Sequence, residues 1–170
     1  MKRLLSAFLS LLLIFLCVPA ASAVNYNGFV YELNDNGTYT ITGYVDFYEE
    51  LVSIPPQIDG IDVTAIGNGA FQHKTNINTV RIPATVTTIG SMAFYGCKNM
   101  ISAVIGEGVT SIGSKAFNSC TSLTGVNLKN VQIVGEYAFY GCTRLTELFC
   151  GNALKVIGAN AFSKCTALDY

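Results

Sequence analysis

A six-residue phrase, Ile-Gly-x-x-Ala-Phe, recurs along the chain at nearly constant spacing. It begins at Ile66, Ile89, Ile112, Val134 and Ile157, and its glycines are 23, 23, 22 and 23 residues apart. A period of this length is typical of proteins in which each repeat forms one coil of a stacked solenoid. A single coil cannot bury its own apolar residues, so stability must come from the stacking of neighbouring coils.

The first 23 residues have the pattern of a secretory signal peptide. Lys2 and Arg3 precede an apolar stretch over residues 4–18, and Ala21-Ser22-Ala23 supplies small residues before a cleavage site. The apolar stretch is shorter than the roughly 20 residues of a membrane-spanning helix. We therefore expect residues 1–23 to be removed. The mature protein should be secreted or on the cell surface, with no membrane-spanning segment.

The first four phrases are each followed by a second apolar pattern, as in Leu123, Val126 and Leu128. Alternation of apolar and polar residues over its last positions predicts a short parallel strand with one buried face. The residues from the glycine to the position three after the phenylalanine suit one short helical turn. The expected fold is α/β and rich in strands, with about five coils of 22–23 residues.

The residues that recur in every copy of the phrase have separate expected roles in each coil. The glycine marks a backbone turn, either with positive φ or with too little room for a Cβ atom. The alanine lets the turn approach its neighbour closely, and the phenylalanine fills the middle of the coil. These roles predict a continuous core along the solenoid.

Cysteines recur with the same period. Cys97, Cys120, Cys142 and Cys165 each follow the phenylalanine by three residues, and Cys150 takes an inward-facing strand position. Parallel stacking points neighbouring side chains the same way, which disfavours disulfides. We expect buried free thiols, and the long spacing without a Cys-x-x-Cys pair is not a zinc pattern.

Residues 24–62 do not fit the repeat and are expected to form an N-terminal cap. Alternating apolar residues, including Phe29, Tyr31 and Ile41, flank the turn sequence Asn-Asp-Asn-Gly at positions 34–37, which predicts a β-hairpin. A partial first coil begins near Val52, because residues 52–55 repeat the pattern of residues 80–83. The hairpin would seal the open edge of the first coil.

The repeats resemble the BspA-like, or treponemal-type, leucine-rich repeat in the pattern Cys-x-x-Leu-x-x-Val-x-Leu/Ile-Pro-x-x-Val-Thr-x-Ile-Gly-x-x-Ala-Phe. The resemblance covers residues 63–170, divided as 63–85, 86–108, 109–130, 131–153 and an incomplete 154–170, and Lys74 replaces one cysteine. It implies a right-handed curved solenoid on exported or cell-surface proteins that bind proteins or mediate adhesion.

Charge divides the chain into two parts. Residues 24–62 carry seven acidic and no basic residues, whereas residues 63–170 carry eight basic and four acidic residues. This distribution is consistent either with two ordinary solvated surfaces or with head-to-body attraction between molecules.

Catalysis has little support in the sequence. His73 is the only histidine, and no serine or cysteine stands with it in a recognisable nucleophile arrangement. The glycines occur at repeat spacing and not in a phosphate-binding loop, and the lysines occupy different columns and form no basic stripe for nucleic acid. We expect no catalytic activity, no cofactor, no bound metal and no nucleic-acid partner.

Function is therefore expected on the outward side of the strands, which is the concave surface of such a solenoid. Val104 and Phe149 are large apolar residues there, and the core of the solenoid does not require them. The predicted ligand-binding residues are Thr79, Arg81, Ser102, Val104, Asn127, Glu147 and Phe149. The expected partner is a protein on a host or neighbouring-cell surface.

Three alternatives remain at this stage. The last coil has no cap in the sequence, so the chain could self-associate through an open C-terminal coil. It could instead be a fragment of a larger surface protein. A glycan-binding domain is the third alternative.

Overall fold

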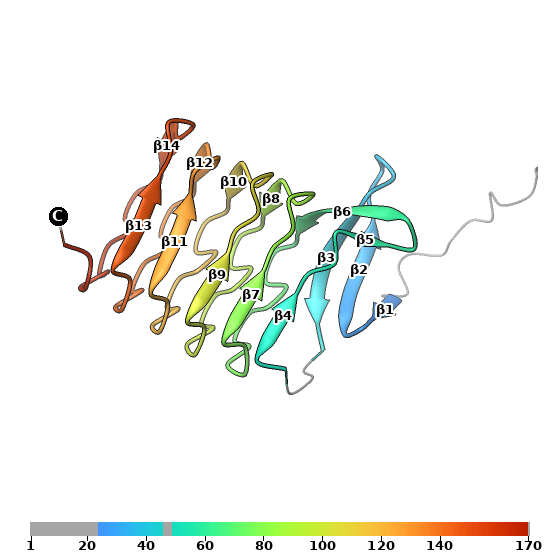
Figure 1. Cartoon of the computed structure of the whole chain (residues 1–170), viewed down its shortest axis with the longest axis horizontal. Coiled ribbons are helices and arrows are strands. Elements are labelled where there is room, and N and C mark those ends of the chain that lie inside the picture. Colours follow the sequence, from blue (N-terminus) through green and yellow to red (C-terminus); the bar gives the residue numbers. More distant parts are fainter. Residues whose placement is uncertain (1–23, 46–48, 170) are drawn as a thin grey trace, which may run out of the picture.

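The computed structural model describes residues 24–45 and 49–169, so the expected signal peptide lies outside the described residues. This part of the chain consists of short strands joined by turns, stacked side by side in one direction (Figure 1). The strands are β1 (Val24–Tyr26), β2 (Phe29–Leu33), β3 (Tyr39–Tyr44), β4 (Leu51–Ser53), β5 (Gln57–Ile58), β6 (Ile61–Ile66), β7 (Thr79–Arg81), β8 (Thr88–Ile89), β9 (Ser102–Val104), β10 (Ser111–Ile112), β11 (Gly125–Leu128), β12 (Ile133–Val134), β13 (Glu147–Cys150) and β14 (Val156–Ile157).

The strands form two principal sheets, and each inner coil contributes one strand to each. The longer sheet has the order β1-β2-β3-β6-β8-β10-β12-β14, with β5 paired to β6, and the five-stranded sheet has the order β13-β11-β9-β7-β4. Strands of successive coils pair in parallel, as in Val80 with Ala103 and Ile89 with Ile112. The repeat period therefore sets the register, and the expected solenoid of about five coils is present.

The prediction of a short helical turn in each coil is wrong, because no helix occurs in residues 24–45 or 49–169. Each coil has two residues with left-handed backbone in this segment, which an α-helix cannot contain. Their φ angles lie between 55° and 71°, at Gly69, Met92, Lys115, Tyr137 and Asn160, and at His73, Gly96, Ser119, Gly141 and Lys164. The backbone instead bonds across coils: the Phe94 N–H donates to the Ala116 carbonyl, and the Phe117 N–H to the Ala138 carbonyl, both at 2.7 Å.

The repeated glycine is required by close backbone approach and not by a positive φ. None of the five phrase glycines is among the residues with positive φ. A Cβ atom on Gly113 would lie 2.6 Å from the Ser91 nitrogen, and one on Gly135 would lie 2.5 Å from the Ser114 nitrogen. Such distances are too short for real Cβ contacts, so any side chain would push neighbouring coils apart.

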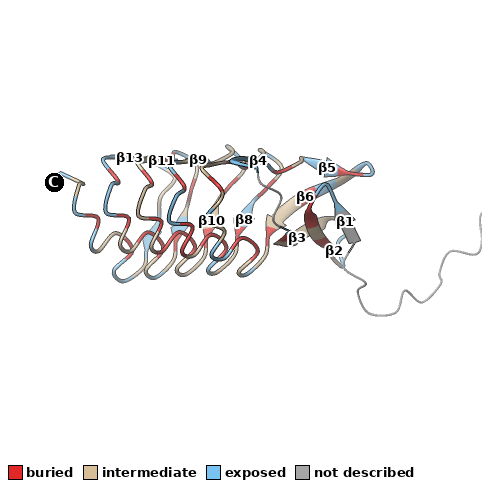
Figure 2. Cartoon of the chain, turned by 90° about the horizontal axis from the view of Figure 1, so that it is seen from below, coloured by how far each residue is buried: buried red, intermediate tan, exposed pale blue. Residues whose placement is uncertain are grey.

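The phenylalanine column forms the centre of one continuous core. Phe71, Phe94, Phe117 and Phe139 are completely buried. Their rings stack on one another and on Phe162, with successive centroids 4.9 to 5.2 Å apart. Figure 2 shows buried residues repeating from coil to coil along the molecule. The expected core column is thus present in every repeat.

The N-terminal segment contains the expected hairpin. Strands β2 and β3 pair antiparallel, and β3 then pairs in parallel with β6 of the first coil. Phe29 and Tyr44 place their rings 6.4 and 5.4 Å from that of Phe71, at the end of the phenylalanine stack. The hairpin therefore continues both the long sheet and the core. Strand β4 pairs with β7 and starts the five-stranded sheet.

The cysteine prediction is correct for four thiols and wrong for the fifth. Cys97, Cys120, Cys142 and Cys165 are buried free thiols, each bonded through Sγ to a phenylalanine carbonyl at 3.0 to 3.2 Å. Cys150 is also free but exposed. It lies on β13, the edge strand of the five-stranded sheet, where no neighbouring strand covers it. A position that is internal in other coils is therefore open here.

Candidate binding surfaces

The outward face of the five-stranded sheet, here called the ladder face, holds all seven residues predicted from the sequence. They project between buried residues such as Val80 and Val126, which point into the core. Strand register places Thr79 beside Ser102 and Arg81 beside Val104. On the other side, Asn127 lies beside Phe149. Residues from separate repeats are thereby joined into one surface.

Exposure differs along the ladder face. Thr79 and Ser102 are half-buried, whereas Arg81, Asn127 and Glu147 are exposed. Val104 is 50% exposed and Phe149 is 58% exposed. Phe149 lies on an edge strand, but Val104 lies on β9 between two other strands. The exposure of Val104 therefore does not result from a position at the edge of the sheet.

The ladder face is hollowed over its last three strands. A depression of about 750 Å³ is lined by residues of β9, β11 and β13, including Val104, Asn127 and Phe149. Gly125 lies between Ser102 and Glu147 in the register and has no side chain to fill this space. The hollow thus combines two apolar side chains with polar groups.

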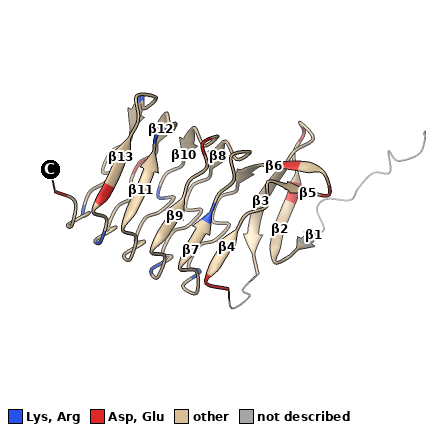
Figure 3. Ribbon diagram, in the orientation of Figure 1, with Lys and Arg blue, Asp and Glu red and all other residues tan. Residues whose placement is uncertain are grey.

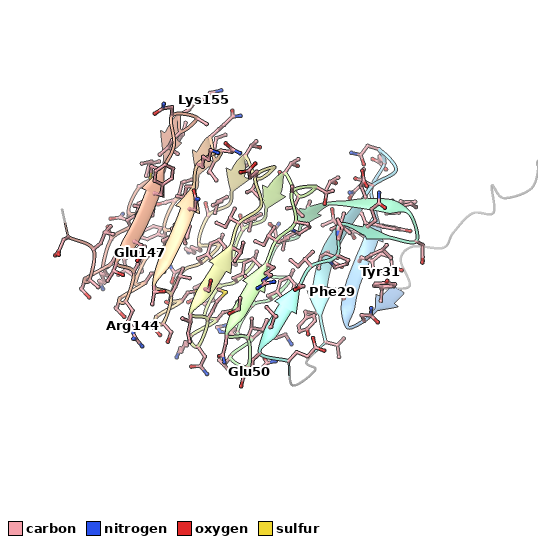
Figure 4. The ribbon with its side chains drawn as sticks, in the orientation of Figure 1. Phe29, Tyr31, Glu50, Arg144, Glu147 and Lys155 are labelled. Carbon is pink, nitrogen blue, oxygen red and sulfur yellow. The ribbon has the colours of Figure 1, made fainter. Side chains whose placement is uncertain are left out.

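Opposite charges lie at the two sides of the ladder face. Arg81 is on β7 and Glu147 is on β13, as Figure 3 shows by colour and Figure 4 shows for the labelled Glu147. Neither side chain forms an ion pair within the part of the chain that the structure describes. Both charges are therefore free to meet complementary groups on a partner.

A second surface, not predicted from the sequence, lies over the turns that follow the repeated glycines. A cavity of about 640 Å³, here called the turn cavity, is lined by Gln72, Met92, Tyr95, Lys115, Asn118, Ser119, Tyr137 and Tyr140. Four successive coils contribute to it. The only signal in the sequence is Asn118, which interrupts a column that holds tyrosine in the coil before and the coil after.

The thiols of Cys97, Cys120 and Cys150 are not activated as nucleophiles, whereas a hydrogen bond with Cys142 lowers the pKa of the Cys165 thiol. Burial raises the pKa of the Cys97 thiol to about 12 and that of Cys120 well above its ordinary value. Burial also raises the pKa of Cys150. A raised pKa keeps a thiol protonated and poorly reactive. His73 is exposed, and its ring lies edge-on to Tyr95 with the ring centres 5.2 Å apart.

Within 24–45 and 49–169, no group of three or more histidine, cysteine, aspartate or glutamate residues is placed to hold a metal ion. No helix in those ranges is long and apolar enough to cross a membrane.

Stacked coils of 22–23 residues, each with one strand on the ladder face and a core of aliphatic and phenylalanine side chains, define a leucine-rich repeat protein. The sequence over residues 51–169 matches the family described as the BspA type leucine-rich repeat region, in six copies. The chain therefore belongs to this family. Leucine-rich repeat domains in general mediate protein interactions.

Solved structures of bacterial leucine-rich repeat proteins have the same fold. The T. pallidum leucine-rich repeat protein is 31% identical with a TM-score of 0.81, and the alignment covers 85% of this chain and 68% of that one. A leucine-rich repeat protein of Bacteroides capillosus is 27% identical with a TM-score of 0.62, over 81% of this chain and 99% of that one. A leucine-rich cell surface protein of Faecalibacterium prausnitzii is 27% identical with a TM-score of 0.59, over 89% and 54%. The comparison with curated proteins gives no match.

Proposed function

We propose that the protein is a secreted or surface-exposed adhesion module that binds another protein through the ladder face and has no catalytic activity. The partner is a protein on the surface of a host or neighbouring cell. The observation that carries this proposal is the half-exposed Val104 on an inner strand, beside a hollow that Phe149 also lines.

Several properties of the ladder face favour a protein partner. A large aromatic side chain contributes contact area that dominates many interfaces, and an adjoining hollow accepts a complementary side chain. Arg81 and Glu147 flank the apolar residues with opposite charges, which fixes the orientation of a partner more than it raises affinity. The residues concerned do not repeat between coils, so the solenoid scaffold does not require them.

Secretion and surface location are part of the same proposal. The signal-peptide pattern of residues 1–23 supports export. The similar F. prausnitzii protein is named a leucine-rich cell surface protein. Leucine-rich repeat proteins are typically non-catalytic, which agrees with the raised pKa values of the buried Cys97 and Cys120 thiols.

The proposal predicts that the double variant Val104→Ser, Phe149→Ser loses its partner. Both side chains are exposed, so the variant should keep its fold and its stability within about 0.5 kcal/mol. Immobilised wild-type protein and variant would be compared for capture of proteins from the surface of candidate host cells. The captured partner would then be titrated against both proteins by surface plasmon resonance.

Ile133→Ser provides the matched control, because Ile133 is 45% exposed but lies on β12 of the other sheet. The control should bind as the wild type does. Equal affinity of the double variant and the wild type, with intact circular dichroism spectra, would refute binding by the ladder face.

Self-association is a second candidate function, and exposure at β14 favours it. Val156 and Ile157 are 50% and 53% exposed, whereas Val134, in the same column as Ile157, is completely buried. An uncovered strand with apolar side chains can pair with another chain. Light scattering would then show a mass that increases with protein concentration, and Ile157→Lys would abolish the increase. A monomer at all concentrations and salt levels would exclude both this contact and head-to-body attraction.

A further inference from the structure

The turn cavity lies on a different part of the surface from the ladder face and combines aromatic, amide, hydroxyl and ammonium groups. Tyr95, Tyr137 and Tyr140 are each partly exposed. The rings of Tyr137 and Tyr140 meet edge to face at 5.4 Å, so they present two differently oriented surfaces to the cavity. A ligand with an apolar face can pack on such rings.

Asn118 creates the space. It replaces a tyrosine in the column that contains Tyr95 and Tyr140, and its smaller side chain leaves a gap between them. Asn118 is only 8% exposed, and its Oδ1 accepts a hydrogen bond from the Ser119 hydroxyl at 2.7 Å. Its amide nitrogen has no acceptor among the residues that the structure describes, and it is open to solvent, because no buried side-chain nitrogen or oxygen among them lacks a partner. This N–H group can therefore donate to a ligand in the cavity.

One lysine lines the cavity, and a second lies beside it against the Tyr140 ring. The Lys115 ammonium group lies 5.9 Å from the centre of the Tyr137 ring, and the Lys164 ammonium group lies 5.1 Å from that of Tyr140. No aspartate or glutamate is among the residues that line the cavity, although Glu136 precedes Tyr137 in the chain. An anionic ligand would therefore meet two lysines near the aromatic surfaces.

We propose that the turn cavity binds an acidic saccharide, one whose sugar rings carry carboxylate or sulfate groups. The tyrosine rings pack against the C–H faces of the sugar, Asn118 and Gln72 bond its hydroxyl groups, and Lys115 and Lys164 pair with its charges. The turn cavity is a depression of about 640 Å³ that is open to solvent, so a short oligosaccharide would lie across it with one face exposed. This proposal does not depend on the ladder face.

Other ligand classes fit less well. A single-stranded nucleic acid also stacks on aromatic rings, but its binding needs a cationic groove that follows a repeating backbone. Lys115 is the one lysine of the cavity lining, and Lys164 lies beside it against Tyr140, so the cations do not form a groove that follows a repeating backbone. A neutral saccharide would leave both ammonium groups without a complementary charge.

The test is isothermal titration calorimetry with defined probes. The acidic probes are a heparin-type sulfated tetrasaccharide and tri-galacturonic acid, the neutral probe is maltotetraose, and the nucleic-acid probe is a four-nucleotide oligothymidylate. Wild-type protein should bind at least one acidic probe with a dissociation constant below about 1 mM. It should bind the neutral probe and oligothymidylate at least about tenfold more weakly.

Three variants locate the site. Asn118→Tyr restores the side chain found in the same column at Tyr95 and Tyr140, so it should fill the cavity and weaken binding by at least about tenfold. Lys115→Ala should lower the affinity for the acidic probes and reduce the salt dependence of their binding. Lys98→Ala removes an exposed lysine outside the cavity and should bind as the wild type does.

Absence of binding by both acidic probes at about 1 mM overturns the proposal. So does full affinity in both Asn118→Tyr and Lys115→Ala, because the ligand would then bind elsewhere. Equal binding of maltotetraose refutes the acidic requirement, and tighter binding of oligothymidylate assigns the cavity to nucleic acid. Because Lys115→Ala changes only a side chain at the surface, it keeps the test valid if Asn118→Tyr fails to fold.

Discussion

At the scale of single residues, each residue type in the repeated phrase is required by one physical constraint. Gly113 and its equivalents lie where the backbone of the preceding coil leaves no room for a Cβ atom. Gly141 has a different role, because it has a φ of 71°. At the equivalent position of another coil, Ser119 takes a φ of 60°. Close approach thus demands glycine more strictly than the left-handed conformation does.

Substitution of these two glycines should separate the two constraints. Gly113→Ala places a methyl group 2.6 Å from the Ser91 nitrogen and should lower the free energy of unfolding by about 3 kcal/mol, at the upper end of overpacking costs. Gly141→Asn should lower it by no more than about 1 kcal/mol, because asparagine tolerates positive φ. Urea unfolding monitored by circular dichroism measures both. A Gly141→Asn variant that loses more stability than Gly113→Ala would reverse this assignment.

The buried thiols predict how stability depends on pH. Burial raises the pKa of Cys97 from 9.0 to about 12, so the folded state retains a proton that the unfolded state releases above pH 9. The thiol therefore leaves stability unchanged well below pH 9 and lowers it as the pH rises from about 9 to about 12. The loss is about 1.4 kcal/mol per pH unit within that window.

Comparison with Cys97→Ala isolates this contribution, since tyrosines and lysines titrate in both proteins. Urea unfolding at pH 7 and pH 10 should show that the wild type loses more stability than the variant between these pH values, by an amount on the order of 1 kcal/mol. The same loss in both proteins would mean that the Cys97 thiol ionises in the folded state as readily as in the unfolded chain.

At the scale of elements, the coil is held together by the stacked phenylalanines and by parallel strands on both sides. The rings of Phe117 and Phe139 are 5.1 Å apart with an angle of 2° between their planes. Successive coils thus place identical side chains in identical environments. An element of this kind depends on its neighbours on both sides.

Truncation within the stack should therefore depend on position. Phe117→Ala, in an inner coil, should lower the free energy of unfolding by about 3–5 kcal/mol. Phe162→Ala should cost less, because Phe162 is only partly buried and stacks on one side alone, against Phe139. Equilibrium unfolding in urea gives both values. Equal losses would show that the cost of truncation does not depend on the position of the phenylalanine in the stack.

The strands and core columns could be predicted because the repeat shows them in several coils at once. The turn conformation could not, since left-handed backbone at Met92, Lys115 and Tyr137 has no glycine to mark it. The exposure of Cys150 depends on the position of its strand at the edge of the sheet and not on the local pattern. The turn cavity was missed because its residues come from different coils and become neighbours only after stacking.

At the scale of the whole molecule, repeated residues form the scaffold and non-repeated residues form its two candidate surfaces. The ladder face presents Val104 and Phe149 over one sheet, and the turn cavity groups Tyr95, Asn118 and Tyr140 at the turns. Acidic residues of the cap lie over β2 and β6 and also just before β4, so part of this charge adjoins the sheet that carries the ladder face (Figure 3). Protein binding by the ladder face is the central functional proposal.

Site-specific photo-cross-linking tests that proposal most directly. A photoreactive phenylalanine analogue would replace Val104 on the ladder face or, as the control, Ile133 on the opposite sheet, and each protein would be irradiated on intact candidate host cells. Both positions are about half exposed, at 50% and 45%. Binding by the ladder face predicts a covalent adduct to one discrete surface protein from position 104 and none from position 133. Equal labelling from both positions, or labelling from position 133 alone, would contradict it.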